Sequence, residues 1–429
     1  MHSQLAPQKL TAVLVGLGHR ARTYGAYAFE HPEELEIVGL ADPDPRRLEH
    51  TATVFDVPPE RCFRSAEELA MQPRFADAAI NGTMDRQHVP TTLPLLEAGY
   101  HVLLEKPIAP NQKELLSLLH MVRKTGRTLM ICHVLRYAPF YAAIRQRVRN
   151  GEIGEIISIT SSERVSYHHM AVAFVRGKWR RRAENPILLA KCCHDLDLLC
   201  WYKSGVRPVR VASHGDLTYF RPDKAPPGAG TRCLVDCQIE AGCPYSARKN
   251  YIEQGLWGFY AWESLEHLEN PTLDDRLESL RTDNPFGRCV WHCDNDVVDH
   301  QSVIVEFADG CVATHTLVGG AARPCRTVHL VGTRGEIEGV MEEGRFTIRK
   351  PDARPGHEYT EEQVDVNVVG SMHGGGDLRL VGDFLRVLRG EPPSLSTTTI
   401  EDSIYGHLIA YAADQSMLEH RVVDIQIIS

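Results

Sequence analysis

Lys106 lies where an α/β sheet would place a reactive group. The segment Glu105-Lys106-Pro107 directly follows the apolar run 101–104, which predicts a strand. In a doubly wound sheet, ligands bind in the crevice outside the carboxyl ends of the strands. Pro107 cannot donate a ladder hydrogen bond and therefore ends the strand next to this lysine. We expect the Lys106 ammonium to point into the crevice, where it can donate to an oxygen that gains negative charge.

His194 is the second candidate for chemistry. Residues 191–201 predict a helix with His194, Asp197 and Trp201 on one face, at i, i+3 and i+7 spacing. An imidazole exchanges its proton near neutral pH and suits a general base. A single histidine on a half-apolar helix is usually structural, so the role of His194 depends on what the fold places beside it.

A glycine turn near the N-terminus predicts a dinucleotide site. The apolar strand 11–15 runs directly into Gly16-Leu17-Gly18-His19-Arg20-Ala21. Gly16 permits the tight turn, and Gly18 lets the backbone approach a pyrophosphate. Ala21 is small enough for the following helix to pack closely on the strand. The N–H groups at the start of that helix would face the phosphates.

Asp42 favours NAD as the cofactor over NADP. It ends the second strand, 36–41, at the distance where an acidic residue accepts hydrogen bonds from ribose hydroxyls. Its carboxylate would repel the 2′-phosphate of NADP. Arg46 and Arg47 follow closely and could offset that repulsion by pairing with the phosphate, or they could be solvated residues of the next helix.

The N-terminal third of the chain predicts a Rossmann domain, residues 1–134. Apolar strands at 76–80, 101–104 and 128–134 alternate with helices near 44–54, 88–98 and 111–124. Strands separated by single helices imply right-handed parallel crossovers. The expected fold class is therefore an α/β doubly wound parallel sheet in this part of the chain.

The remaining chain, residues 135–429, predicts an α+β domain on an open, mainly antiparallel sheet. A helix at 138–149 precedes a strand that begins at 155–160. Strands expected at 208–219, 299–307, 311–318, 326–332 and 345–350 follow, and the later ones have no helices between them. We expect this sheet to face the crevice, bind substrate and mediate oligomerisation.

The stretch 221–298 interrupts this sheet as an insertion rich in cysteine and tryptophan. Cys233, Cys237 and Cys243 could form a zinc site with Cys193 or His292, although their spacing is not a common zinc pattern and free buried thiols are the preferred reading. The tryptophans could stack on a sugar face or pack the insertion, and packing is preferred. They are Trp257, Trp262 and Trp291.

Composition excludes several classes of protein. The chain has 429 residues, a net charge of -9 and a 24% charged fraction, which indicates globular domains without the basic patch that binds nucleic acid. No run of 18 uncharged apolar residues occurs, so no contact with a membrane is expected. Twelve cysteines and a polar N-terminus favour reduced thiols and a cytoplasmic location.

Taken jointly, these motifs resemble the Gfo/Idh/MocA oxidoreductases, the family of glucose-fructose oxidoreductase and inositol dehydrogenase. The resemblance covers nearly the whole chain. The residues that carry it are the Gly16 turn, Thr83 followed by His88, Glu105-Lys106-Pro107, Arg136-Tyr137, and His194 with Asp197. The family implies a nicotinamide in the first domain and a sugar, cyclitol or related polyol against the sheet of the second.

The resemblance also implies roles for individual residues. Lys106 is similar to the lysine that binds the reacting hydroxyl, and His194 to the catalytic histidine. Arg136 and Tyr137 are expected beside the substrate. The cofactor contacts are expected at Gly16, Gly18, His19, Arg20, Asp42, Thr83, His88, Glu105 and Lys106. Alcohol oxidation needs a base and an alkoxide donor, tasks that suit His194 and Lys106.

One position departs from the family pattern. Many relatives carry an aspartate four residues before the histidine, where this chain has Ala190. The candidates for a replacement are Asp197, His373 and Asp377. The last two belong to the glycine-rich segment 373–377, which could close on substrate or simply lead into a helix at 378–390.

Three functions stay open on the sequence alone. The first is reversible oxidation of a secondary alcohol on a sugar, glycoside or cyclitol. The second is an NAD-dependent glycoside hydrolase that oxidises its sugar transiently, with Tyr137 and His373 as additional acid and base. The third is a nucleotide-sensing regulator without catalysis, which the presence of Lys106 and His194 disfavours. An open antiparallel sheet usually needs a cover, which favours a homodimer or homotetramer.

Overall fold

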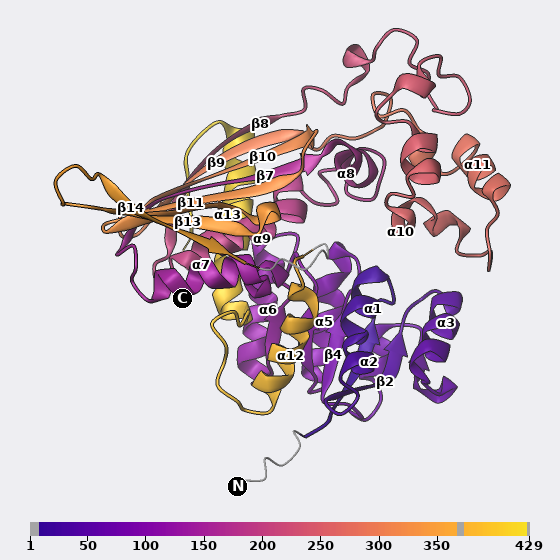
Figure 1. Ribbon diagram of the computed structural model, residues 1–429. Coiled ribbons are helices and arrows are strands. Elements are labelled where there is room, and N and C mark those ends of the chain that lie inside the picture. The colour runs from indigo at the N-terminus through magenta and orange to yellow at the C-terminus, as the bar shows by residue number, and fades with distance from the viewer. Residues whose placement is uncertain (1–7, 367–372, 427–429) are drawn as a thin grey trace.

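Two β-sheets organise the molecule, as the computed structural model in Figure 1 shows. The structure describes residues 8–366 and 373–426. The first sheet has six strands and the second has nine. The sheets lie in different parts of the molecule, and helices from the C-terminal part of the chain contact both.

The first sheet is parallel throughout, in the order β3-β2-β1-β4-β5-β6. Its strands are β1 (Leu10–Val15), β2 (Leu35–Ala41), β3 (Cys62–Phe63), β4 (Ala78–Asn81), β5 (His101–Leu104) and β6 (Leu129–Ile131). The strand order reverses between β1 and β4, which is where a doubly wound sheet opens its ligand crevice. The Rossmann prediction is confirmed.

Helices cover both faces of this sheet, and one of them comes from the far end of the chain. Those from the N-terminal part are α1 (His19–Gly25), α2 (Tyr27–Glu30), α3 (Pro45–Phe55), α4 (Ala66–Ala70), α5 (His88–Glu97) and α6 (Gln112–Thr125). Helix α12 (Gly376–Leu388) packs beside α1 and α2, and its Leu380 and Phe384 join the core that contains Leu14 and Tyr24.

The second sheet is antiparallel except at one place. Its order is β14-β13-β12-β11-β7-β10-β9-β8-β15, and only the β7 and β10 pair is parallel. The strands are β7 (Ile156–Ser166), β8 (Pro208–Asp216), β9 (His300–Phe307), β10 (Val312–Ala321), β11 (Cys325–Gly332), β12 (Gly335–Val340), β13 (Arg345–Pro351), β14 (Tyr359–Asp365) and β15 (Val423–Asp424). The expected mainly antiparallel sheet is confirmed.

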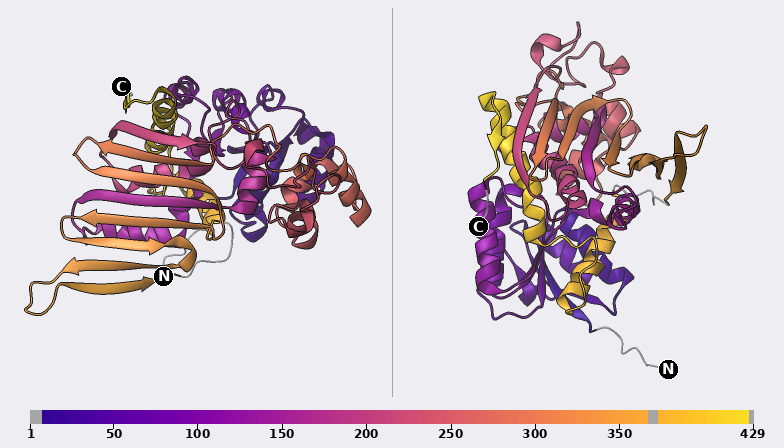
Figure 2. Two further views of the ribbon diagram at one scale, coloured as in Figure 1. Left: turned by 90° about the horizontal axis from the view of Figure 1, so that it is seen from above. Right: turned by 90° about the vertical axis from the view of Figure 1, so that its left-hand side faces the viewer.

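Three long helices cover one face of this sheet: α7 (Pro139–Arg149), α9 (Ile187–Tyr202) and α13 (Ile400–Glu419). Figure 2 (left) shows the opposite face turned to the viewer. Ile157, Ile304, Val312 and Val318 are exposed on strands of this sheet. Helix α13 also contacts the first sheet's core through Ile400 and Ile404.

The insertion forms short helices and turns rather than strands. They include α10 (Gly258–Ala261) and α11 (Leu273–Arg281), and a single helical turn, α8 (Tyr167–His169), lies at the end of β7. A bridge between Arg232 and Arg288 joins the two ends of the insertion. Within the described residues, no helix has the length and apolar character needed to cross a membrane.

Candidate active site

The glycine turn after β1 has the shape that a pyrophosphate needs. Gly16 has φ +74°, and a Cβ there would lie 2.7 Å from Thr83, so only glycine fits. A Cβ on Gly18 would meet no atom within 4 Å, so the space above it is open. This cradle fits the phosphates of a dinucleotide at the start of α1. The structure thus places Gly16, Gly18 and Thr83 together, as expected.

Asp42 braces this turn. Its Oδ2 accepts a hydrogen bond from the Leu17 N–H at 2.6 Å, and its Oδ1 accepts one from the Asp44 N–H at 2.8 Å. The carboxylate is buried and joins the ends of β1 and β2. Asp42 therefore positions the nucleotide loop through the backbone, in addition to any contact with ribose.

The two arginines after Asp42 are already engaged. Arg47 lies 2.8 Å from Glu263 and 2.9 Å from Glu266, both in the insertion. These carboxylates raise the pKa of Arg47 although its partial burial acts in the opposite direction. Arg46 lies 3.5 Å from Asp44. Arg47 is therefore not simply a solvated residue of α3, because its ion pairs connect the insertion to the first domain.

Lys106 lies at the crevice and points to the catalytic helix. Its Nζ donates to the Ala190 carbonyl oxygen at 3.3 Å, one turn before His194 on α9. Burial alone would lower the pKa of Lys106, but Cys193, Glu105 and Asp85 raise it above its ordinary value. The side chain is therefore a protonated hydrogen-bond donor at neutral pH.

Glu105 and Arg20 form a network behind Lys106 instead of projecting toward a cofactor. Glu105 accepts from Arg20 and from the Tyr24 hydroxyl at 2.7 Å each, and from the Lys106 N–H at 2.6 Å. Arg20 also binds Asp377 at the start of α12. The polar atoms of both side chains have protein partners, which supports a positioning role, and their expected cofactor contacts stay predictions.

His194 lies in the crevice as a neutral imidazole. It is 4% exposed, and burial together with the charge of Lys106 lowers its pKa well below the ordinary value. Its Nδ1 is buried and has no partner within the described chain. A neutral ring beside a protonated lysine can accept a proton from a hydroxyl that the lysine holds.

Of the candidate replacements for the group missing at Ala190, His373 and Asp377 lie close to His194. The ring centroids of His194 and His373 are 5.9 Å apart. His373 Nδ1 lies 3.1 Å from Asp377 Oδ2, and burial lowers the pKa of His373 despite this carboxylate. Arg20 and His373 hold the pKa of Asp377 far below its usual range although burial acts in the opposite direction. The glycine-rich segment therefore brings a second, oriented imidazole to the site.

Asp197, the other candidate helper, is bound elsewhere. Its carboxylate accepts from Arg136 at 2.6 and 2.7 Å, and both residues are buried. The remaining Arg136 donors bind the carbonyl oxygens of Thr397 and Asp402. Every guanidinium nitrogen of Arg136 has a protein partner, so the structure does not offer the expected substrate contact directly and that contact stays a prediction.

Tyr137 and His88 are also structural. The Tyr137 hydroxyl donates to Asp383 at 2.8 Å, and the ring is buried in the core beneath α12. The expected catalytic and substrate role of Tyr137 is thus corrected to packing. His88 has both ring nitrogens on carbonyl oxygens, of Pro107 at 2.6 Å and Thr83 at 3.0 Å. It clamps the Lys106 turn to the glycine turn rather than meeting the cofactor.

The insertion adds side chains that sequence reasoning missed. Phe259 stacks on His19 at 4.7 Å, where α1 begins. Tyr260 lies near Lys106. Burial raises the pKa of Tyr260, although the charge of Lys106 acts in the opposite direction. Trp257 stacks on His169 at 4.3 Å and has φ +55°, a strained value for a bulky residue. The run Trp257-Gly258-Phe259-Tyr260 was the available signal.

The other two tryptophans pack the insertion. Trp291 is buried against Tyr245, and the Arg276 guanidinium lies 5.3 Å from the Trp262 ring. The described residues contain two groups of three metal-ligand atoms within 4.8 Å of one another: Cys192, Asp195 and His315, and His31, Glu33 and Glu34. Asp195 is already paired with Arg326, which opposes cation binding.

The zinc candidates are in neither group. Cys193 lies beside Lys106 and His292 Nδ1 lies 2.8 Å from the Gly230 carbonyl oxygen, so neither is the extra ligand that was considered. Cys233, Cys237 and Cys243 are free thiols, without the mutual spacing of ligands on one ion.

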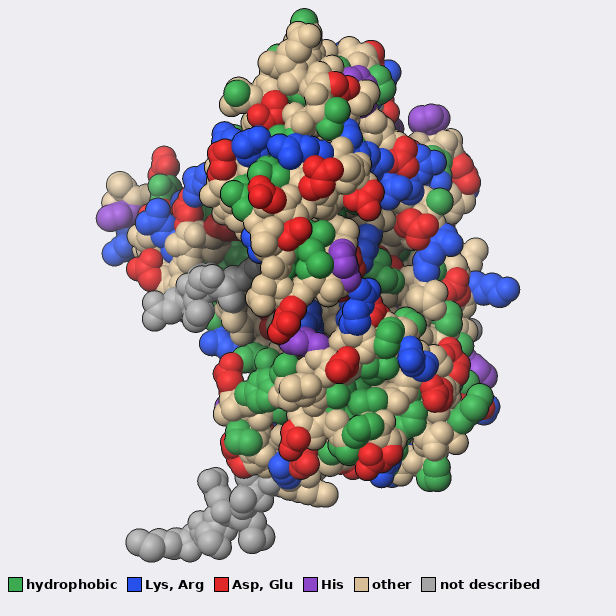
Figure 3. All heavy atoms as spheres, turned by 90° about the vertical axis from the view of Figure 1, so that its right-hand side faces the viewer, with side chains coloured by type: hydrophobic (Ala, Val, Ile, Leu, Met, Phe, Trp, Pro, Cys, Tyr) green, Lys and Arg blue, Asp and Glu red, His purple; other side chains and the backbone are tan. Residues whose placement is uncertain are grey.

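These side chains form one cluster around Lys106. Figure 3 shows a hollow between the lower and upper parts of the molecule, with basic and histidine side chains at its rim. The first domain, α9, the segment before α12 and the insertion all contribute to the cluster around Lys106. Such a recess can hold a dinucleotide on one side and a small polar substrate on the other.

Comparisons with known proteins agree with this geometry. The model of the Gfo/Idh/MocA oxidoreductase family, described as having an NAD-binding Rossmann fold, matches residues 10–133. YteT of Bacillus subtilis strain 168, named as an oxidoreductase, is 26% identical over 378 residues, covering 81% of this chain and 82% of YteT. An inositol 2-dehydrogenase of Corynebacterium glutamicum is 28% identical over 176 residues, covering 41% of this chain and 48% of that protein.

Solved structures share the fold over the whole chain. A levoglucosan dehydrogenase in complex with NADH has a TM-score of 0.71 at 16% identity, covering 98% of this chain and 100% of that chain. This TM-score shows that the fold of both domains is shared, and with so low a sequence identity the likeness extends to the fold alone.

Proposed function

Because the chain belongs to the Gfo/Idh/MocA family of NAD-binding oxidoreductases, we propose that it transfers a hydride between nicotinamide and a secondary hydroxyl of a sugar, glycoside or cyclitol. Residues 1–134 hold the cofactor and residues 135–429 hold the substrate. The observation that carries this proposal is the position of protonated Lys106 one turn from neutral His194, beside the glycine turn.

The chain's own residues perform the proton half of the reaction. Lys106 donates a hydrogen bond to the reacting hydroxyl and stabilises the alkoxide as it forms. His194 accepts the hydroxyl proton. His373, oriented by Asp377, stands next to His194 and passes the proton onward. A dinucleotide whose pyrophosphate is held at Gly16 and Gly18 would supply the hydride acceptor for the carbon that bears the reacting hydroxyl.

NAD is the proposed cofactor rather than NADP. Asp42 is buried at the end of β2, where its charge would repel a 2′-phosphate. Arg47, which could neutralise such a phosphate, is held by two carboxylates of the insertion. An NADP enzyme would need those contacts to open.

A second candidate is redox-assisted glycoside hydrolysis. Two adjacent imidazoles, His194 and His373, provide the acid and base that elimination of an aglycone needs in addition to hydride transfer. In the insertion, the exposed Phe259 with the partly buried Trp257 and Tyr260 offers a surface for an aglycone. Tyr137, first expected to take part, is replaced in this proposal by His373 alone.

One experiment separates these reactions. The protein is mixed with NAD and a panel of sugars, glycosides and inositols, and the absorbance of reduced nicotinamide is followed alongside aglycone release. Stoichiometric reduced cofactor without released aglycone supports the dehydrogenase. Aglycone release with catalytic NAD supports the hydrolase. If no compound of the panel gives reduced nicotinamide or released aglycone, both proposals are excluded and a regulator without catalysis becomes the favoured function.

We also propose that the chain forms a homodimer or homotetramer through the uncovered sheet face. That face carries exposed Ile157, Ile304, Val312 and Val318, and burying them against a second copy would remove apolar surface from water. Light scattering after size exclusion tests this. Ile304→Lys should shift the mass toward one chain, whereas a monomeric parent protein would rule the interface out.

A further inference from the structure

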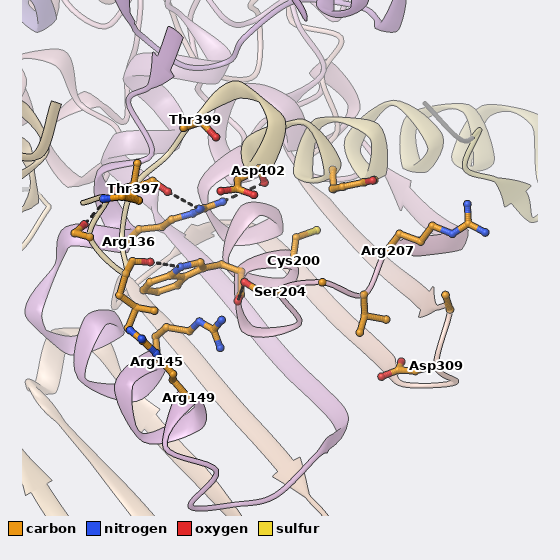
Figure 4. A pocket seen from close by; sticks show the side chains of 18 residues that line it. Arg136, Arg145, Arg149, Cys200, Ser204, Arg207, Asp309, Thr397, Thr399 and Asp402 are labelled. Carbon is orange, nitrogen blue, oxygen red and sulfur yellow. Dashed lines mark hydrogen bonds between the residues drawn. The ribbon is translucent and has the colours of Figure 1, made fainter. Parts of the chain in front are cut away.

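A pocket of about 840 Å³ lies at the C-terminal end of α9, whereas Lys106 contacts Ala190 near the start of the same helix; the pocket is shown in Figure 4. Helix α7, the end of α9, the turn at Asp309 and the start of α13 line it. Arg145 and Arg149 lie together on one side, and Arg207 and Asp309 lie on the opposite side. We call this the arginine pocket. Its volume is in the range of small-ligand sites.

The charges of the arginine pocket are not balanced by protein. The described residues provide no carboxylate partner for Arg145, Arg149 or Arg207. Two acidic residues also line the pocket: Asp309 lies 2.5 Å from Lys203, and Asp402 stands in the first turn of α13, where a carboxylate is favourable. Three arginines without partners therefore share one concave surface.

The surroundings of Arg145 favour binding of an anion. Its guanidinium lies 5.9 Å from the Trp201 ring centroid, and its Nε is buried without a hydrogen-bond partner in the described chain. Burial and the neighbouring positive charges of Arg136 and Arg149 lower its pKa. A buried donor without a partner costs free energy, and like charges at short range repel. An anion between these groups would accept a hydrogen bond from the unpaired donor and would reduce the repulsion between the positive charges.

We propose that the arginine pocket binds a small phosphorylated metabolite, with Arg145 and Arg149 gripping the phosphate and Arg207 attracting it from the opposite wall. Guanidinium groups bind phosphate through paired, charge-assisted hydrogen bonds. The pocket is larger than a phosphate ion alone, which leaves room for the organic part of the ligand. Its innermost residue, Arg136, holds Asp197 on α9, three residues after His194. The site is distinct from the crevice and independent of the proposed hydride transfer.

Calorimetric titration of the NAD-saturated protein tests this proposal, since bound NAD keeps probes out of the glycine turn. The probes are inorganic phosphate, glycerol 3-phosphate and uncharged glycerol, at constant ionic strength. We expect saturable binding of the two phosphates only. Arg145→Gln and Arg149→Gln should each weaken it by about tenfold or more. Arg64→Gln, an exposed arginine of the first domain, should leave it unchanged.

Three outcomes would overturn the proposal, and the first two are no heat of binding at millimolar phosphate and equal affinity in wild type and both pocket variants. Arg149 is exposed at the end of α7, so its variant remains informative if the partly buried Arg145→Gln does not fold. Binding of glycerol as tight as that of glycerol 3-phosphate would equally reject a phosphate site.

Discussion

His194 and His373 face each other at 5.9 Å although almost half of the chain separates them. The first belongs to α9 and the second to the turn before α12. Asp377 orients the second ring, and Arg20 from the first domain holds Asp377. Three segments therefore build the proposed proton acceptor, and the proposed path takes the proton from His194 to its neighbour.

Replacing His373 or Asp377 should slow the reaction without loss of the cofactor. His373→Asn removes the second imidazole, and we expect kcat to fall by about a hundredfold. Asp377→Asn leaves the ring but releases its orientation, so a smaller fall of about tenfold is expected. Steady-state kinetics with an active substrate measure both. His357→Asn, on an exposed loop, is the matched control. A kcat equal to that of the parent protein in both site variants would contradict proton transfer from His194 to His373.

Lys106→Ala should abolish hydride transfer while NAD still binds. The lysine donates to the reacting oxygen, and loss of such a donor costs about a hundredfold or more in rate. NAD binding rests mainly on the glycine turn, so its dissociation constant should change by less than about threefold. Stopped-flow absorbance and fluorescence titration give the two values. Lys113→Ala, which is exposed on α6, should match the parent protein, and full turnover in Lys106→Ala would refute the assignment.

The pH profile should be flat across the neutral and weakly alkaline range. His194 must be neutral to accept a proton, and its pKa is lowered well below 6.5 by burial and Lys106. Lys106 must be protonated to donate, and its pKa is raised above 10.5. Both groups therefore hold their working form between these values. The logarithm of kcat/KM plotted against pH tests this, and a drop centred near 6.5 would show that the base is a different group.

Gly16 and Gly18 should respond differently to alanine. A Cβ at Gly16 would clash with Thr83 and force a positive φ, so Gly16→Ala should destabilise the fold by about 1 kcal/mol or more. Gly18→Ala meets no protein atom, so thermal stability without NAD should be retained. Its methyl group instead occupies the space proposed for the pyrophosphate. Normal NAD affinity in Gly18→Ala would remove the phosphate from this position.

Freeing Arg47 should improve the use of NADP. In the double variant Glu263→Gln with Glu266→Gln, the guanidinium loses both anionic partners and can pair with a 2′-phosphate. The ratio of kcat/KM for NADP to that for NAD should rise by about tenfold. Glu269→Gln, exposed in the same segment, serves as the control. An unchanged ratio would mean that Arg47 does not face the ribose.

The parallel sheet and its glycine turn could be predicted because their signals are local. Each apolar strand of the first domain is continuous in sequence, and the turn needs Gly16 and Gly18 at fixed spacing. Strands β12 and β14 were missed. Strand β14 is mostly exposed and rich in acidic residues, so it lacks the alternation of apolar residues that identifies a strand.

Roles that depend on distant partners could not be predicted. From the sequence, Arg136 and Tyr137 were both expected to contact substrate. In the structure, Arg136 pairs with Asp197 and Tyr137 donates a hydrogen bond to Asp383. The sequence distances between these partners carry no pattern. Lys106 and His194 were identified because each has a distinctive local setting, a strand end and a helix face. Tyr260 was missed because the aromatic run at 257–260 indicates packing or stacking but not which part of the chain Tyr260 reaches.

Helix α12 gives the protein an order of assembly. It covers the first sheet's core and begins at the residues that orient the proposed proton acceptor, yet it is synthesised after every strand of the first sheet and all strands of the second except β15. The nucleotide-binding domain is synthesised early, and its apolar faces stay exposed until α12 and then α13 are available. A nascent or C-terminally truncated chain would therefore lack both a finished core and a working proton path. Catalytic competence arrives only with completed synthesis.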